Sequence, residues 1–362
     1  MSDSPAPTVD ELLGDAVGMG ASDVHFTVGL PPQVRIGGSW QSLGKERLER
    51  ADCETIARSF TRDEAGWACF QDEWEYDTSY SVAGVGRFRV NLFLQRGSPG
   101  VACRALPFEI PHFEDLGLPE STMEGLCRLP SGLVLVCGPT GSGKSTTLAA
   151  MVGHINRTCH AHIVTMEDPI EFLHRHVLSI VDQREVGLDT KSFVSAMRHV
   201  LRQSPDVVLV GEIRDQETVR TAIMLAETGH LVLTTIHSGE VVQGLSRLTD
   251  MFPPEQQEEV KVSLASVLKA MLVQQLIPRR ESDKERVLAY ELMLTNTAIQ
   301  NQIRNGKYEQ VYSQLQTRKE SGMRTMNDSL LALFRADQID ADAALTKSIR
   351  PEEIQRAIGT RQ

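Results

Sequence analysis

A glycine-rich segment near the middle of the chain carries the strongest chemical signal. Gly138, Gly143, Lys144 and Ser145 follow the pattern Gly-x-x-x-x-Gly-Lys-Ser, with the apolar run 133–137 before them and a helical pattern after them. In such a loop, glycines let backbone N–H groups turn inward around phosphate oxygens, and the new helix adds the positive end of its dipole. Lys144 would reach the β- and γ-phosphates, and the Ser145 hydroxyl would bind Mg²⁺. The segment therefore predicts a nucleoside triphosphate site.

The alternative for this segment is a glycine-rich turn without a ligand. At average residue usage the bare pattern arises by chance in roughly one chain in a hundred of this length. The flanking strand and helix patterns make that alternative less frequent still, because a phosphate loop requires them. The residues predicted to contact the nucleotide are Gly138, Pro139, Thr140, Gly141, Ser142, Gly143, Lys144, Ser145 and Thr146.

Ionisable residues stand at the ends of three further apolar runs, 162–167, 206–211 and 229–237. In open parallel sheets, ligands bind at the carboxyl ends of the strands. The first run leads into Glu167-Asp-Pro-Ile-Glu171, whose carboxylates would hold Mg²⁺ or activate water, unless they form a solvated turn. The second ends at Glu212, which resembles a Walker B acid, although an ordinary strand-end acid is the alternative.

Two histidines bracket the third of these runs. His230 and His237 stand at its two ends, and an isolated histidine in such a place is more often structural than catalytic. Because two histidines flank the run that follows Glu212, a role at the phosphate is as reasonable here as a structural role.

Composition limits the other function classes. The 362 residues suffice for two or three domains, and the formal net charge of −11 argues against non-specific nucleic-acid binding. No apolar run approaches the length that spans a membrane, and no Lys or Arg precedes Arg35, so no secretory signal is expected. The six cysteines include no Cys-x-x-Cys pair, which favours reduced thiols over a metal site or disulfide framework.

The pattern of elements predicts two domains, 1–106 and 121–362, joined by a proline-punctuated linker at 107–120. The first domain should be α+β, and the second should hold a parallel sheet buried between helices. The predicted strands are 23–28, 33–36, 76–82, 86–95, 133–137, 162–167, 206–211, 229–237 and 287–294. The predicted helices are 8–19, 49–60, 62–70, 144–155, 191–203, 215–227, 255–276, 297–305, 308–319, 325–335 and 351–358.

These motifs together resemble the family of secretion and pilus ATPases, and within it the retraction branch of the type IV pilus ATPases. The resemblance covers nearly the whole chain. The matching segments are Ala21-Ser-Asp-Val-His25, Gly29-Leu-Pro-Pro32, Gly86-Arg-Phe-Arg-Val-Asn91, Glu167-Asp-Pro-Ile-Glu171, Gln183-Arg-Glu-Val186, Gly211-Glu-Ile-Arg-Asp215 and Glu227-Thr-Gly-His230 to His237.

The resemblance implies a role for several side chains. Glu171 would be the catalytic carboxylate that polarises water, Glu212 would support Mg²⁺, partly through water, and His230 and His237 would sense the γ-phosphate. Arg89 and Arg104, which would otherwise be solvated strand residues, would reach the nucleotide when the domains close. The implied fold is an α/β RecA-like P-loop ATPase domain with a smaller α+β, PAS-like N-terminal domain and a helical C-terminal tail.

Two departures from family patterns bear on the branch. Secretion and pilus-extension ATPases often carry a tetracysteine zinc element, which this chain lacks, and this favours the retraction branch. The C-terminal motif Ala-Ile-Arg-Asn-Leu-Ile-Arg of retraction ATPases reads Ala298-Ile-Gln-Asn-Gln-Ile-Arg304 here. Ile299 and Ile303 keep helical spacing, whereas Gln300 and Gln302 change the surface chemistry. Residues 184–190 also look similar to the accessory paralogue.

The expected protein is a homohexameric ATPase that uses ATP and Mg²⁺ to drive pilus retraction. It would act in the cytoplasm at the inner-membrane base of the pilus, on a platform protein and possibly with a paralogous retraction ATPase. An accessory retraction ATPase, and less so an extension or type II secretion ATPase, are the alternatives within the family. A nucleic-acid-dependent RecA-type motor and a non-hydrolysing, nucleotide-gated scaffold are the alternatives from other classes.

Overall fold

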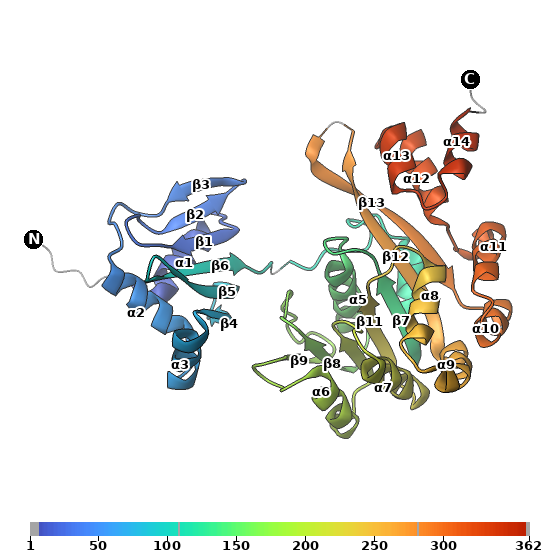
Figure 1. Ribbon diagram of the computed structural model, residues 1–362, viewed down its shortest axis with the longest axis horizontal. Helices are drawn as coiled ribbons and strands as arrows, with labels where there is room; N and C mark the ends of the chain where they lie inside the picture. The colour runs from blue at the N-terminus through green and yellow to red at the C-terminus, as the bar shows by residue number, and fades with distance from the viewer. Residues whose placement is uncertain (1–6, 108, 281, 360–362) are drawn as a thin grey trace, which may run out of the picture. The chain divides into compact units, whose positions relative to one another are not determined.

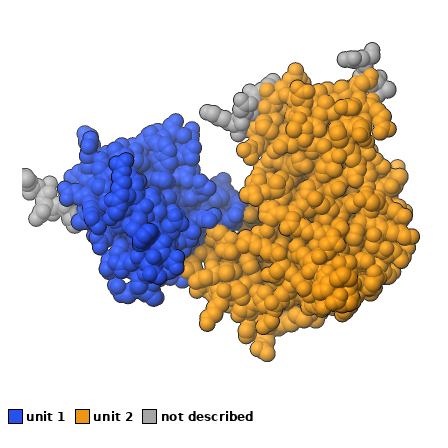
Figure 2. Space-filling view, in the orientation of Figure 1, with its two compact units in different colours: residues 1–109, 171–173 blue, residues 110–170, 174–362 orange. Residues whose placement is uncertain are grey.

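The computed structural model describes residues 7–107, 109–280 and 282–359, and it describes side chains for all of these except 282–284. The predicted domains 1–106 and 121–362 and the linker 107–120 therefore include some residues outside the described part, namely 1–6, 108, 281 and 360–362. The chain divides into two compact units, residues 1–109 with 171–173 and residues 110–170 with 174–362 (Figure 2).

The first unit is an antiparallel sheet with helices on one face (Figure 1). Its six strands have the order β3-β2-β1-β6-β5-β4. Along β5, Phe88, Val90 and Leu92 are buried, while Arg89 on the opposite face is exposed. This alternation follows from the two-residue period of a strand. The elements are α1 Val9–Gly18, β1 Asp23–Phe26, β2 Gln33–Ile36, β3 Ser39–Ser42, α2 Arg50–Phe60, α3 Glu64–Glu73, β4 Glu75–Val82, β5 Gly86–Gln95 and β6 Ser98–Ala105.

The second unit is built on a mixed sheet of seven strands in the order β13-β12-β7-β11-β10-β8-β9. All neighbours in it are parallel except β12 and β13. The strands are β7 Gly132–Cys137, β8 His162–Glu167, β9 Ile180–Glu185, β10 Val207–Val210, β11 Leu231–Ile236, β12 Leu268–Arg279 and β13 Ser282–Leu294. The helices are α4 Glu120–Cys127, α5 Lys144–Thr158, α6 Phe193–Val200, α7 Gln216–Glu227, α8 Val241–Asp250, α9 Pro254–Val267, α10 Thr297–Arg304, α11 Glu309–Thr317, α12 Met326–Arg335, α13 Ala341–Lys347 and α14 Pro351–Gly359, with 3₁₀ turns η1 Leu201–Gln203 and η2 Lys319–Ser321.

Helices cover both faces of this sheet, which is why its central strands are largely apolar. Leu133 and Leu135 of β7 face a cluster built from α6 to α9 and the C-terminal helices. Val134 and Val136 face a second cluster built from α4 and α5. Every residue of β7, β10 and β11 is buried. The predicted α/β fold with a helical C-terminal tail is confirmed.

The predicted helix 255–276 is wrong in its second half. Helix α9 ends at Val267, and the chain continues as strand β12 between β7 and β13. Ala270 and Leu272 belong to one core cluster and Met271 and Val273 to the other, as expected for a strand buried on both faces. A nearly continuous apolar run has neither helical nor alternating periodicity, so the pattern alone does not distinguish the two.

Several other elements were not predicted from the sequence. The predicted set contains no counterpart of β3, β6, β9, α4, α8 or α13. Part of the predicted linker packs on the second unit, because Phe113 and Leu118 are buried in the cluster that includes Met151 of α5. Within the described residues, no helix combines the length and apolar character needed to cross a membrane.

The burial of β12 leads to a stability prediction. Leu272→Ala should destabilise the second unit by about 2–5 kcal/mol, because a leucine that is 1% exposed leaves a cavity when truncated. The control Val262→Ala, at a residue of α9 that is 50% exposed, should change stability by less than about 0.5 kcal/mol. Calorimetry would measure the transition. Tryptophan fluorescence should not shift, because Trp40, Trp67 and Trp74 all lie in the first unit. Equal effects of the two variants would contradict the burial of β12.

Candidate nucleotide site

The carboxyl ends of four parallel strands meet at one edge of the second sheet. Cys137 at the end of β7 pairs with Ile236 of β11, and Val210 of β10 pairs with both Thr234 of β11 and Met166 of β8. The residues that follow these ends therefore share one edge. The structure places the phosphate loop, His237, Glu212 and Glu167 there, as the strand pattern predicts.

The phosphate loop has the backbone that its glycines allow. Gly138, Gly141 and Gly143 have φ angles of 146°, 76° and 90°. Helix α5 begins at Lys144, and Gly143 before it provides no side-chain cap. The N–H groups of this first turn are consequently available to an anion. Lys144 Nζ lies 3.0 Å from the carbonyl oxygens of both Gly138 and Pro139, so its ammonium is held above the loop.

Three observations test whether this loop fits a Mg²⁺–nucleotide. A Cβ on Gly138 would lie 2.4 Å from Ser142 Oγ and 2.5 Å from the carbonyl oxygen of Gln274, so only glycine permits this close approach. Ser142 Oγ is buried and has no hydrogen-bond partner among the described residues. Ser145 is half-buried in the first turn of α5 and carries the hydroxyl that such loops use for Mg²⁺. The residues present fit a bound nucleotide with its cation.

A buried glutamine supports the loop from the neighbouring strand. Gln274 of β12 is 1% exposed, and its Nε2 donates a hydrogen bond of 2.9 Å to Thr147 Oγ1 on α5. Its Oε1 has no partner among the described residues. Gln274 is not among the site residues predicted from the sequence. The available signal was a polar side chain inside an apolar run, which is costly to bury unless it forms hydrogen bonds.

A charged cluster lies beside the loop at the ends of β10 and β11. His237 Nε2 is 3.1 Å from Glu212 Oε1, and Arg214 Nε is 2.9 Å from Glu212 Oε2. Arg214 also lies 3.9 Å from Asp168. Thr235 Oγ1 donates to the carbonyl oxygen of Gly211 at 2.7 Å and fixes the two strand ends together. The structure thus brings Glu212 and His237 into contact, and it adds Arg214, to which the sequence analysis gave no role.

The two histidines are not equivalent. His230 precedes β11, and its carbonyl oxygen accepts the N–H of Gly132 at the start of β7. It therefore lies at the opposite edge of the sheet, because the six residues of β11 span about 20 Å at 3.3 Å per residue. Its Nδ1 is 2.9 Å from the carbonyl oxygen of Leu225, a structural contact. The structure therefore places His230 away from this phosphate loop, and its role in sensing the γ-phosphate stays a prediction.

The acidic segment after β8 is anchored at two points. Glu167 Oε1 accepts hydrogen bonds from Thr165 Oγ1 at 2.6 Å and from Gln183 Nε2 at 3.2 Å. The N–H of Ile170 donates to Glu185 Oε2 at 3.1 Å. The sheet positions Glu167 directly, while the exposed Glu171 follows four residues later, in the stretch 171–173 that groups with the first unit.

The two predicted arginines lie side by side on the first unit. Arg89 of β5 is opposite Arg104 of β6 in the strand register, and both are exposed. Asp23 of β1 is opposite Arg104 on its other side, and Arg104 Nε lies 2.9 Å from Asp23 Oδ1. Like charges directly opposite each other destabilise a sheet. The acidic neighbour offsets part of that repulsion, and two guanidinium groups remain on an open face.

The crowding at Gly138 gives a testable prediction. Gly138→Ala should weaken ADP binding at least tenfold, because the new methyl group would displace Ser142 or β12 from the loop. The control Gly125→Ala, in helix α4 with nothing within 4 Å of the added Cβ, should leave affinity unchanged. Fluorescence titration with a labelled ADP would measure both. Wild-type affinity in Gly138→Ala would show that this loop does not hold the phosphates.

Comparisons with known proteins agree with this geometry. The family model described as Type II/IV secretion system protein matches residues 87–339. The chain is 41% identical to the type IV pilus retraction ATPase PilT of Pseudomonas aeruginosa, over 95% of this chain and 99% of that protein. It is 37% identical to the type IV pilus ATPase PilU of the same organism, over 93% of this chain and 87% of that protein.

A solved structure is similar over almost the full length. The crystal structure of the pilus retraction motor PilT with bound ADP superposes with a TM-score of 0.88 at 45% identity, covering 97% of this chain and 99% of that one. The similarity includes both units and the helical tail. The chain therefore belongs to the Type II/IV secretion system protein family, in its branch of pilus ATPases that includes PilT and PilU.

Proposed function

We propose that this protein is a hexameric motor that hydrolyses ATP to drive type IV pilus retraction, the disassembly of pilin that powers twitching motility. The observation that carries the proposal is the phosphate loop with Glu212 and His237 beside it, in a chain similar from end to end to a retraction ATPase. The solved relative holds ADP, which supports an adenine nucleotide as the ligand.

The catalytic roles divide among the residues of the sheet edge. The loop N–H groups and Lys144 bind the β- and γ-phosphates. Ser145, and Glu212 partly through water, would hold Mg²⁺, which would supply positive charge to the phosphate oxygens. Glu171 orients the attacking water and accepts its proton. His237 contacts Glu212 at 3.1 Å, so a γ-phosphate that attracts the imidazole competes with that carboxylate. This competition would report whether a γ-phosphate is present.

Arg89 and Arg104 complete the proposed mechanism. Their exposed guanidinium groups would stabilise transition-state charge when the first unit closes on a nucleotide, so hydrolysis would depend on domain closure. Successive closures around a homohexamer would then act on an inner-membrane platform protein at the cytoplasmic base of the pilus. A paralogous retraction ATPase is a further proposed partner. No direct contact with nucleic acid is proposed, in line with the net charge of −11.

A second candidate is the accessory retraction ATPase, which the similarity to PilU favours. The C-terminal motif bears on this choice. Ile299 and Ile303 of α10 are fully buried, whereas Gln300 and Gln302 are half-buried where the retraction motif has arginine and leucine. Gln302 Oε1 is buried without a hydrogen-bond partner among the described residues. This helix face therefore differs in polarity from that of the retraction motif.

Replacing the proposed general base separates binding from hydrolysis. Glu171→Gln should lower kcat at least 100-fold while ADP affinity stays within twofold, because the amide cannot accept the proton from water. Phosphate release and nucleotide titration would measure the two effects. Arg89→Ala should lower kcat in the same assay, and an unchanged rate would remove the arginine from the mechanism. A Glu171→Gln variant as active as wild type would assign the base elsewhere.

The native cell tests the direction of the motor. Deletion of the gene should leave abundant surface pili that do not retract, and wild type should restore retraction whereas Lys144→Ala should not. Electron microscopy and retraction assays would score the two traits. Loss of surface pili on deletion would instead indicate an extension motor. Retraction that weakens only under load would indicate the accessory paralogue. Full rescue by Lys144→Ala or Glu171→Gln would favour a non-hydrolysing scaffold.

A further inference from the structure

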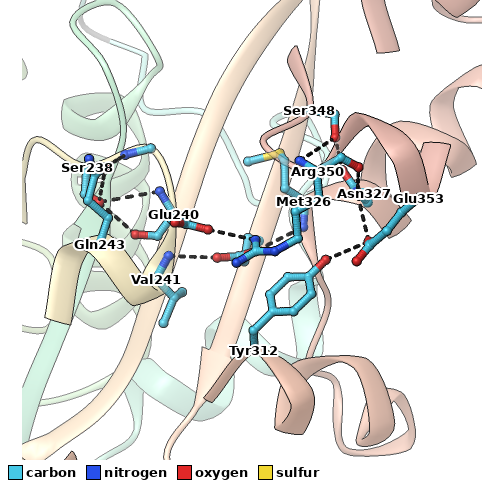
Figure 3. Close-up of polar contacts among 12 residues, drawn as sticks. Ser238, Glu240, Val241, Gln243, Tyr312, Met326, Asn327, Ser348, Arg350 and Glu353 are labelled. Atoms are coloured by element: carbon cyan, nitrogen blue, oxygen red, sulfur yellow. Dashed lines mark hydrogen bonds and ion pairs between the residues drawn. The ribbon is translucent and has the colours of Figure 1, made fainter. Parts of the chain in front are cut away.

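A buried carboxylate joins the nucleotide edge of the sheet to the C-terminal helices. Glu291 of β13 is 2% exposed. Its Oε1 accepts the N–H of Val241 at 2.8 Å, and its Oε2 accepts the N–H of Met326 at 3.2 Å. Val241 is the first residue of α8 and Met326 is the first residue of α12 (Figure 3). One carboxylate therefore caps the N-termini of two helices that are far apart in the sequence.

The segment capped on one side comes directly from the proposed site. Only residues 238–240 separate His237 from the start of α8. Ser238 Oγ donates to the carbonyl oxygen of Glu240 at 2.7 Å, and the N–H of Gly239 donates to Gln243 Oε1 at 3.1 Å (Figure 3). Arg247 of α8 donates to the carbonyl oxygen of His237 at 2.9 Å. A shift of the first turn of α8 would consequently move His237.

A second connection runs parallel to the first. Arg350, between α13 and α14, lies 2.8 Å from Glu240 Oε2, and its guanidinium stacks 3.7 Å from the ring centroid of Tyr312 (Figure 3). Tyr312 OH donates to Glu353 Oε2 at 2.8 Å, and Asn327 Nδ2 donates to the same oxygen at 2.8 Å. The N-cap residue of α8 is thus tied to α11, α12 and α14 by side chains that are mostly removed from solvent.

The contacts at Glu291 favour an ionised carboxylate. Two backbone N–H groups donate to two different oxygens, and the ionised form accepts both as charge-assisted hydrogen bonds, whereas protonation turns one oxygen into a hydroxyl group that is a weaker acceptor. A glutamine would set its NH₂ group against one of these N–H donors. The first turns of α8 and α12 also favour negative charge through their dipoles. Neither a glutamine nor an apolar residue would hold both helices in this way.

We propose that Glu291 is a positioning residue for ATP hydrolysis, and that through it the C-terminal helices control the placement of His237 beside Glu212. Glu291 couples the two helices because the first N–H of each donates to its carboxylate, in addition to the Thr325 cap of α12. We call this contact between α8, Glu291 and α12 the junction. Movement of α12 alters the cap of α8, and the short segment 238–240 carries the change to His237. This inference rests on the proposed function, because it assigns His237 a part in hydrolysis.

The pH dependence of stability at Glu291 supports a functional role for this carboxylate. Burial raises the pKa of Glu291 to about 7, although the N–H groups of Val241 and Met326 lower it. Glu240 also raises the pKa and Arg350 lowers it, while Tyr312 and Glu353 stand behind Arg350. Between the unfolded value of 4.5 and about 7, the folded protein binds the proton more tightly. Ionisation therefore reduces stability as pH rises through this window, so stability alone does not favour a glutamate here.

The test replaces the carboxylate by its neutral isostere. At pH 8, Glu291→Gln should lower kcat for ATP hydrolysis about tenfold, with KM for ATP within twofold and a melting temperature within a few degrees of wild type. Wild-type kcat should fall as pH drops through about 7, and the variant should lack that step. The matched control Glu309→Gln, at an exposed carboxylate of α11, should behave as wild type.

A second variant removes the connection between Arg350 and Glu240, which is more exposed than Glu291. Arg350→Gln, whose parent side chain is 26% exposed, breaks the ion pair with Glu240 and should lower kcat in the same direction by a smaller factor. If Glu291→Gln does not fold, Arg350→Gln still tests whether the C-terminal helices control the placement of His237, because wild-type kcat in this variant would contradict that control. Combined with Glu240→Gln it should cost no more than either change alone, because the two residues act as one pair.

The outcomes separate this inference from the proposed function. Loss of activity in His237→Ala together with wild-type kcat in Glu291→Gln and Arg350→Gln would overturn the inference and leave the function standing. Reduced ADP affinity in step with reduced kcat would also overturn it, because a merely structural role predicts both. A wild-type protein that does not hydrolyse ATP would overturn the proposed function itself.

Discussion

The backbone hydrogen bonds between four parallel strands are the constraint on which the site depends. Because β7, β11, β10 and β8 run in the same direction and in register, their carboxyl ends lie at a single edge. Helices on both faces keep these strands largely apolar, so the charged groups of the site stand at or beyond the last strand residue. The buried threonines Thr165, Thr234 and Thr235 interrupt the apolar pattern, and the hydroxyl groups of Thr165 and Thr235 each bond a strand end to a neighbouring group.

This constraint explains which parts of the site the sequence could predict. Glu212 and His237 directly follow apolar runs, and Lys144 follows another after the glycine-rich loop, so their common edge could be inferred from chain order alone. His230 stood in the same motif, but it precedes its strand, and the direction of the strand carries it to the far edge. A motif records which residues occur together in the sequence, whereas strand polarity decides which of them meet in space.

The remaining differences have a similar origin in sheet pairing. The apolar run of β12 has no period that distinguishes a helix from a strand buried on both faces, and only its pairing with β7 and β13 decides. Arg214, Gln274 and Glu291 were each visible as polar residues near or within apolar runs. The partners of Gln274 and Glu291, however, come from segments that the sequence pattern does not connect. Val241 and Met326 are 50 and 35 residues from Glu291.

Glu291 also shows how a residue that lowers stability can couple two helices. Burial raises the pKa of this carboxylate to about 7, so its ionisation in the folded protein reduces stability as pH rises toward that value. It offers instead one rigid acceptor group shared by α8 and α12, so neither helix start can shift without affecting the other. Packing alone would give the two helices contact but not this mutual dependence. In a protein whose chemistry is proposed to drive movement, such a junction links nucleotide chemistry at the sheet edge to helices at the end of the chain.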